Sequence, residues 1–107
     1  MVNQGEIIVL DLDPQAGHEQ KGRRPALVIS NNSFNRYSNM HMICPITNTN
    51  KNHAFHIPLD ERTKTNGVIL CDQARILDIA ARDYEFIERL PQDILGRAKD
   101  LLISFIE

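Results

Sequence analysis

A polar stretch over residues 16–25 holds the densest group of side chains that could do chemistry. Its ionisable and amide residues are His18, Glu19, Gln20, Lys21, Arg23 and Arg24. The three cations and one anion give it a charge of +2, whereas the whole chain carries −2. We expect an anionic ligand to bind here, because the rest of the chain carries a net charge of −4, that is −2 minus +2, and repels it. The alternative is a solvated loop that only connects two strands, because long loops also occur without a function.

Metal-free cleavage of RNA is the reaction that these residue types suit best, with Thr47 and Asp72 added from later in the chain. The 2′-hydroxyl attacks the adjacent phosphorus, and the 5′ oxygen leaves. An arginine such as Arg24 presents fixed donors to the phosphate oxygens. A histidine or a carboxylate moves the proton, and a threonine hydroxyl holds a phosphate oxygen. The sequence has no serine-hydrolase elbow, phosphate-binding glycine loop or zinc-ligand spacing, so other chemistries have less support.

Composition is typical of one globular domain, which we expect to span residues 1–107. Cys44 and Cys71 both lie in apolar runs, and we expect them to be reduced core residues. The start of the chain lacks a signal-peptide pattern. No apolar run approaches the roughly 20 residues that a membrane span needs. We therefore expect a cytoplasmic location.

Short apolar runs rich in β-branched residues predict a mostly antiparallel sheet of five to seven strands. The expected strands cover residues 6–12, 26–30, 40–46, 55–59, 68–74, 75–79 and 84–90. Pro45 and Pro58 indicate an edge strand or a bulge where they occur. In a regular strand over 68–74, Asp72 and Gln73 face opposite sides. Residues 31–38 are rich in turn formers and predict a loop with one helical turn.

An apolar stripe at helical spacing predicts a helix at the end of the chain. Pro91 suits its first turn, and Asp93 favours the positive end of its dipole. The stripe consists of Ile94, Leu95, Ala98, Leu101, Leu102, Phe105 and Ile106. The predicted fold is mainly β, a small barrel-like structure or twisted antiparallel sheet with this one helix.

Short motifs follow one another in a fixed order along nearly the whole chain. They are Gly5-Glu6-Ile7, Asp11-Leu12-Asp13-Pro14, Gly17-His18-Glu19-Gln20, Arg24-Pro25-Ala26, Phe34-Asn35-Arg36, Pro45-Ile46-Thr47, Gly67-Val68, Cys71-Asp72-Gln73, Arg75 and Asp78. This ordered set resembles the MazF/PemK/Kid toxin family. The histidine after Gly17 and the Cys-Asp-Gln triplet make it most similar to the PemK/Kid branch.

The resemblance implies an SH3-like or CcdB-like barrel, or a twisted sheet, that forms a homodimer. It implies a sequence-specific endoribonuclease toxin, an mRNA interferase, which cuts single-stranded RNA without a ribosome, metal or other cofactor. The products would be a cyclic phosphate and a 5′-hydroxyl. It also implies a cognate antitoxin that blocks the RNA groove, and DNA binding only through the complex with that antitoxin.

Matching the family's motifs residue by residue implies a catalytic role for Arg24 and Thr47. In the Kid branch it also implies a role for His18 and Asp72. That branch has an arginine directly before Cys-Asp-Gln, where this chain has Leu70, and the change shifts charge stabilisation onto Arg24. Further candidates for contact with RNA are Gln20, Lys21, Asn48, Phe55 and Gln73.

Each candidate also has a structural alternative. Arg24 could form an ion pair with Glu19 or Asp72, and Asp72 could serve only to orient Arg24 or His18. His18 could be a solvated loop residue, and Phe55 could belong to the core. Two other functions stay open, namely a gyrase-poisoning toxin of the same fold and a non-catalytic RNA-binding relative.

Overall fold

The computed structural model describes residues 2–13, 22–49 and 53–107. Its elements run in the order β1 (Glu6–Asp11), β2 (Arg23–Val28), α1 (Asn32–Ser38), β3 (His41–Thr47), β4 (His56–Pro58), β5 (Val68–Leu70), 3₁₀ helix η1 (Cys71–Gln73), β6 (Arg75–Leu77), 3₁₀ helix η2 (Ile79–Arg82), β7 (Glu85–Arg89) and α2 (Gln92–Ser104). In the parts described, no helix is both long and apolar enough to span a bilayer.

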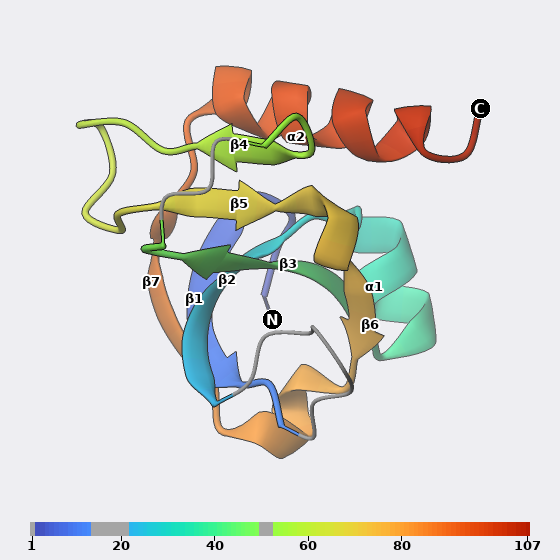
Figure 1. The fold of residues 1–107 in the computed structure, drawn as a ribbon. Helices are drawn as coiled ribbons and strands as arrows, with labels where there is room; N and C mark the ends of the chain where they lie inside the picture. Colours follow the sequence, from blue (N-terminus) through green and yellow to red (C-terminus); the bar gives the residue numbers. More distant parts are fainter. Residues whose placement is uncertain (1, 14–21, 50–52) are drawn as a thin grey trace.

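The strands form one antiparallel sheet in the order β4-β5-β3-β2-β1-β7, with β6 pairing on β3 (Figure 1). The sheet is open, so the twisted-sheet alternative is the one found, and its seven strands confirm the expected mainly β fold. Pro58 lies in β4, which is an end strand of the sheet, as predicted.

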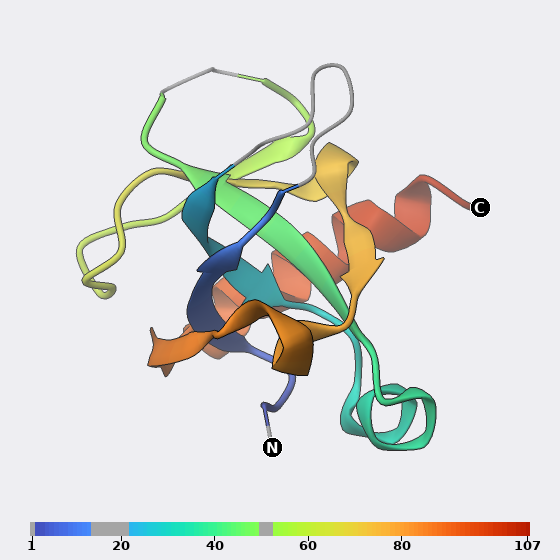
Figure 2. The ribbon, with the colours of Figure 1, turned by 90° about the horizontal axis from the view of Figure 1, so that it is seen from below.

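Pro45 lies in β3, a central strand rather than an edge. On one side β3 pairs with β2, and Pro45 is opposite Ala26. On its other side β3 pairs with β6 through His41–Ile43 and with β5 through Ile46 and Thr47. Pro45 therefore lies where the neighbour changes, a position at which a missing N–H costs little. Figure 2 shows β3 crossing the molecule between these neighbours.

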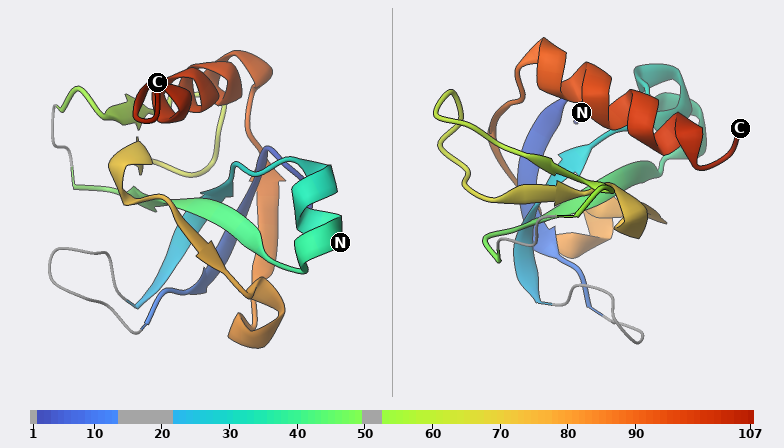
Figure 3. Two further views of the ribbon diagram at one scale, coloured as in Figure 1. Left: turned by 90° about the vertical axis from the view of Figure 1, so that its right-hand side faces the viewer. Right: turned by 45° about the horizontal axis from the view of Figure 1, so that its top comes forward.

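Two apolar clusters cover the two faces of the sheet. The first packs α2 against one face through Ile94, Leu95 and Ala98, over strand residues such as Leu27 and Ile46. The second joins Ile8, Leu10, Ala26, Val28, Ile43 and Leu77 to Ile79 of η2. Figures 1 and 3 show α2 and η2 on opposite sides of the sheet. Apolar burial of this kind stabilises the fold by roughly 25 cal/mol per Å².

Several predicted bounds differ from the structure. β2 begins at Arg23, so Pro25 does not close the preceding loop but pairs with Val9 inside the sheet. Residues 71–73 form η1 instead of continuing a strand. Helix α1 is longer than the expected single turn, and the Asn31 side chain caps it by accepting from the Phe34 N–H at 2.8 Å. Pro91 is the cap residue before α2 rather than part of its first turn.

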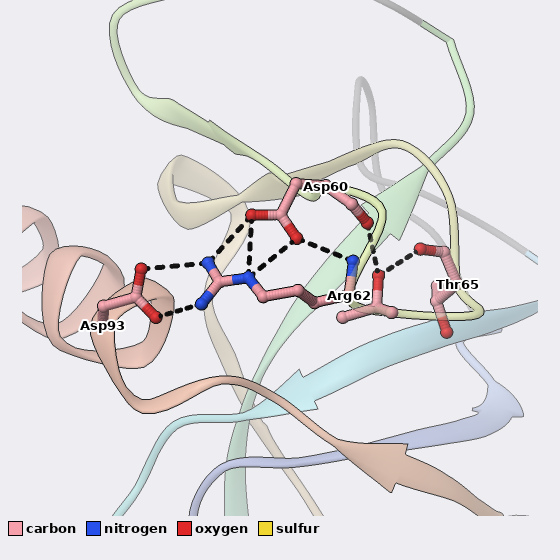
Figure 4. Close-up of polar contacts among 5 residues, drawn as sticks. Asp60, Arg62, Thr65 and Asp93 are labelled. Atoms are coloured by element: carbon pink, nitrogen blue, oxygen red, sulfur yellow. Dashed lines mark hydrogen bonds and ion pairs between the residues drawn. The ribbon is translucent and has the colours of Figure 1, made fainter.

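The connection between β4 and β5 is fastened to α2 by Arg62 (Figure 4). The Arg62 guanidinium donates to both carboxylate oxygens of Asp93, at 2.9 and 3.0 Å. It also donates to Asp60, with its shortest contact at 2.8 Å. Such forked pairing fixes direction as well as distance. Asp93 therefore holds this loop against the first turn of the helix.

Candidate functional site

Arg24 and Thr47 come from neighbouring strands whose pairing brings them to the same end of the sheet. Ala26 of β2 pairs with Pro45 of β3. Arg24 and Thr47 each lie two residues further along, so they continue that register. Side chains two residues apart on a strand share a face. The structure therefore places both on one face, which we call the Arg24 face and which lies opposite α2.

The backbone of Thr47 is held in place by the close approach of Gly67. Thr47 pairs with Val68 of β5 and is 5% exposed. Its Oγ1 accepts a hydrogen bond from the Thr49 N–H at 3.2 Å, which leaves the hydroxyl proton available to a ligand. Gly67 has a φ of +116°, and a Cβ built there would lie 2.0 Å from the Thr47 carbonyl oxygen. Only glycine accommodates this backbone at that distance.

The pairing continues to a histidine–carboxylate pair on the same face. Val68 lies opposite Thr47, and Leu70, two residues further along β5, pairs with His56 of β4. His56 therefore shares the Arg24 face. Its Nε2 lies 3.3 Å from Asp72 Oδ1, and the His56 side chain is 8% exposed against 37% for Asp72. The turn of η1 directs Asp72 to this histidine, so the expectation of a regular strand here was wrong.

Phe55 lies at the margin of the site. Its ring meets Phe105, the residue directly after α2, edge-on, with centroids 5.1 Å apart and planes at 83°. The residue is 43% exposed, so it is neither a core residue nor a free platform. The His53 ring lies 5.2 Å from Phe55 and is stacked on His56 at 4.7 Å. An aromatic group thus extends from the Arg24 face towards the end of α2.

Hydrogen bonds tie the two described ends of the connection between β1 and β2 to each other, and two arginines anchor the β1 end. The Leu12 N–H donates to the Gly22 carbonyl at 2.9 Å, and the Gly22 N–H donates to Asp13 Oδ1 at 3.0 Å. Arg82 donates to the Asp13 carbonyl at 2.7 Å, and Arg75 donates to the Leu12 carbonyl at 3.2 Å. These contacts fix Asp13 and Gly22, the two residues between which the connection runs.

Of the remaining predicted residues, three fall outside the part of the chain that the structure describes, and two are placed by it. His18, Gln20 and Lys21 lie outside the described residues. Asn48 is exposed directly after Thr47, and Gln73 is half-buried in η1.

Sequence reasoning missed His56 and Arg82 as parts of the site. The predicted strand over 55–59 placed His56 on a face, but only the pairing of β4 with β5 and the η1 turn bring it to Asp72. No local pattern identifies the Arg82 contact with Asp13, since the two residues are far apart in the sequence.

Cys44 and Cys71 are both buried and free, which confirms the expectation of reduced core residues. The hydrogen bond between the two thiols and burial raise the pKa of Cys44 far above its usual range. A thiol that stays protonated is a poor nucleophile. Thiolate chemistry at Cys44 is therefore excluded.

Comparison with known proteins identifies the family. Residues 3–106 match the family described as PemK-like, MazF-like toxin of type II toxin–antitoxin system. The chain is 38% identical to the endoribonuclease PemK of Escherichia coli, over 94% of this chain and 82% of that protein. It is 40% identical to the endoribonuclease toxin ChpB of Escherichia coli K12, over 96% of this chain and 92% of that protein.

Solved structures agree with this match. MazF from Deinococcus radiodurans superimposes with a TM-score of 0.91 at 36% identity, covering 98% of this chain and 96% of the other. A MazE–MazF structure from the same organism gives a TM-score of 0.83 at 30% identity, covering 98% and 94%. The chain therefore belongs to the family of PemK-like, MazF-like toxins of type II toxin–antitoxin systems.

Proposed function

We propose that residues 1–107 act as a single-domain endoribonuclease toxin that cuts single-stranded RNA at specific sequences, without a metal or a ribosome. The observation that carries this proposal is the register that puts Arg24 and Thr47 at one end of one face. The relatives at 38% and 40% identity are named endoribonucleases, which disfavours a gyrase-poisoning or non-catalytic function.

The proposed reaction forms a bond from the 2′-oxygen to phosphorus and breaks the bond from phosphorus to the 5′ oxygen. A base takes the 2′-hydroxyl proton, and an acid supplies a proton to the leaving oxygen. Arg24 donates to the phosphate oxygens as negative charge develops on them. The Thr47 hydroxyl donates to one of these oxygens, since its oxygen accepts from the Thr49 N–H and its own O–H proton is left for the phosphate.

His18 and Asp72 are the proposed groups for proton transfer. Asp72 is the more exposed member of its pair with His56, so Asp72 meets the RNA and His56 positions it from behind. Leu70 is buried and cannot replace the arginine that the Kid branch has at this position. More of the charge stabilisation therefore falls on Arg24.

RNA binding extends the proposed site along the Arg24 face. Asn48 follows Thr47 and offers an amide to a base edge, and Gln73 is next to Asp72. Phe55 offers the exposed part of its ring for stacking, which is worth about 1–3 kcal/mol per base when it occurs. Gln20 and Lys21 are the proposed RNA contacts from the polar stretch over residues 16–25.

The proposed partners follow from the family. A cognate antitoxin binds the toxin and blocks the RNA groove, and DNA is bound only through that complex. A second copy of the chain forms a homodimer, and Ile103, Phe105 and Ile106 are apolar residues exposed at the end of α2 that suit such an interface. We place the toxin in the cytoplasm, where its mRNA substrate lies.

Incubation of the purified protein with long RNA in EDTA tests the proposal. We expect fragments with cyclic phosphate and 5′-hydroxyl ends. Arg24→Ala should lower the cleavage rate by about 10²–10³-fold, the loss typical of one preorganised donor. Arg23→Ala is the matched control, because Arg23 lies on the opposite face of β2 and pairs with Glu85 at 3.6 Å. It should cleave within a few-fold of the wild type.

Three results would count against this function. Intact RNA with folded wild-type protein excludes cleavage, and a gel shift without fragments points to a non-catalytic binder. Arrest of DNA replication with intact RNA points to a gyrase poison. If Arg24→Ala fails to fold, judged by circular dichroism, Arg24 is structural.

A further inference from the structure

We propose that His53, His56 and Asp72 bind a transition-metal ion of the Zn²⁺ type, and that this ion inhibits RNA cleavage. The binding part stands on its own, whereas the inhibition rests on the proposed function. The ion is a regulator of the site and takes no part in the reaction.

The three side chains already gather around one point. One ligand atom from each residue lies within 4.8 Å of the other two. His56 Nε2 and Asp72 Oδ1 are 3.3 Å apart. In a tetrahedral zinc site with bonds of about 2.0–2.1 Å, neighbouring ligand atoms are about 3.3–3.4 Å apart. The His56–Asp72 pair therefore has the spacing of one edge of such a site before any ion binds.

A tight turn brings His53 to this edge. The His56 N–H donates to the His53 carbonyl at 3.1 Å, which folds the two histidines back on each other. Their rings stack with centroids 4.7 Å apart and planes at 30°. His53 is exposed, and its Nδ1 accepts from the Phe55 N–H at 3.1 Å. A small rotation of this exposed ring exchanges that bond for a bond to the ion, and solvent takes the fourth position.

The donor set selects the class of ion. Two imidazoles and one carboxylate are the ligands that Zn²⁺ shares with Ni²⁺, Cu²⁺ and Co²⁺. Mg²⁺ and Ca²⁺ prefer oxygen ligands and would gain little from the two rings. Tighter binding of Zn²⁺ than of Mg²⁺ or Ca²⁺ therefore distinguishes this site from a general attraction of cations to exposed carboxylates.

Inhibition follows from the place of Asp72. It lies on the Arg24 face with His56, whose pairing with Leu70 continues the register from Thr47. A carboxylate bound to the ion is no longer available for proton transfer. The ion also places positive charge and bound solvent where the RNA backbone must lie. Zn²⁺ should therefore lower the rate of cleavage, and EDTA should restore it.

Binding is tested by titrating the metal-free full chain with Zn²⁺ in a calorimeter, and with Co²⁺ while its visible spectrum is recorded. We expect one ion per chain and Co²⁺ bands typical of tetrahedral coordination. His53→Ala should weaken Zn²⁺ binding at least tenfold without unfolding the chain, since the residue is exposed. His41→Gln removes a histidine at the end of β3 remote from Thr47 and should leave the Zn²⁺ affinity unchanged.

Three results would overturn the site. These are no Zn²⁺ binding, equal binding by His53→Ala and the wild type, or loss of binding in a folded His41→Gln variant. His56→Gln is a second variant, and its melting curve shows whether lost binding reflects lost fold. None of these measurements requires RNA cleavage, so they do not depend on the proposed activity.

Inhibition is tested with RNA in a separate experiment. The wild type should lose cleavage on addition of Zn²⁺ and recover it in EDTA, whereas Mg²⁺ at the same concentration should have no such effect. His53→Ala should cleave like the wild type in EDTA and resist Zn²⁺. Tight Zn²⁺ binding with undiminished cleavage would overturn the inhibition, and absence of cleavage in EDTA would refute the proposed function instead.

Discussion

Replacing Gly67 by alanine should displace Thr47 and destabilise the sheet. The new Cβ would lie 2.0 Å from the Thr47 carbonyl oxygen and 2.7 Å from its carbonyl carbon. Real Cβ atoms essentially never approach within 3.0 Å, so the strands must separate by about 1 Å at this point. Both contacts are with backbone, which cannot rotate out of the way as a flexible side chain can.

The expected cost has two parts. A non-glycine residue at a φ of +116° costs about 1–3 kcal/mol. Weakening the pairing of Thr47 with Val68 costs about 1 kcal/mol more. A total of about 2–4 kcal/mol corresponds to a fall in melting temperature of roughly 8–16 °C for a domain of this size. A displacement of 1 Å at Thr47 should also lower cleavage by about 10²-fold below the melting temperature.

Gly96→Ala is the matched control, since Gly96 lies within α2 and a Cβ there meets nothing within 4 Å. Alanine in a helix is favoured over glycine by about 1 kcal/mol, so this variant should be more stable. Urea unfolding followed by circular dichroism measures both changes. The reasoning is wrong if Gly67→Ala unfolds at the wild-type urea concentration, or if both variants move in the same direction.

Three further perturbations address contacts away from the strand pairing. Arg62→Ala should speed amide hydrogen exchange over residues 60–66 with little change in melting temperature, because exposed ion pairs add little stability; Arg62 holds the pKa of Asp93 below its usual range, and an NMR titration should show that pKa rising in the variant. Glu88→Gln should cost about 1–2 kcal/mol at neutral pH. Burial raises the pKa of Glu88, but hydrogen bonds from Lys64 and Thr65 outweigh it and lower the pKa overall; the stability gained is present above about pH 4.5 and lost below it, so unfolding curves of wild type and variant should converge in acid. Burial lowers the pKa of His41, so the unfolded chain takes up the proton first as the pH falls through about 6.5; wild-type stability should decrease over that range, and a flat pH profile, or one unchanged in His41→Gln, would contradict this.

Local sequence patterns correctly predicted those elements whose apolar residues show a clear pattern within the element itself. The apolar run rich in β-branched residues over 6–12 corresponds to β1, and the apolar stripe after Pro91 corresponds to α2. β2 was predicted too short because Arg23 and Arg24 are polar and Pro25 lacks an N–H. Pairing with β1 decides their conformation, and that pairing is not local.

The candidate site was predictable only at positions that match a residue of a family motif. Arg24, Thr47 and Asp72 were all candidates, and the registers of β2 with β3 and β3 with β5 explain how distant positions meet. The partner of Asp72 was not predictable, because His56 reaches it only through a three-residue turn at the end of a strand. An antiparallel sheet with seven strands allows many registers, and a shift of one residue would move Thr47 to the other face.

The two end strands of the open sheet also affect how the protein behaves when concentrated. β4 is short and contains Pro58, and β7 carries the charged residues Glu85, Glu88 and Arg89. Short edges, proline and charge all discourage a second chain from adding a strand. Intermolecular β-pairing is thereby disfavoured at both ends, so association between copies should depend on side-chain surfaces. A toxin of this design can accumulate with its sheet open and still resist growth into fibrils.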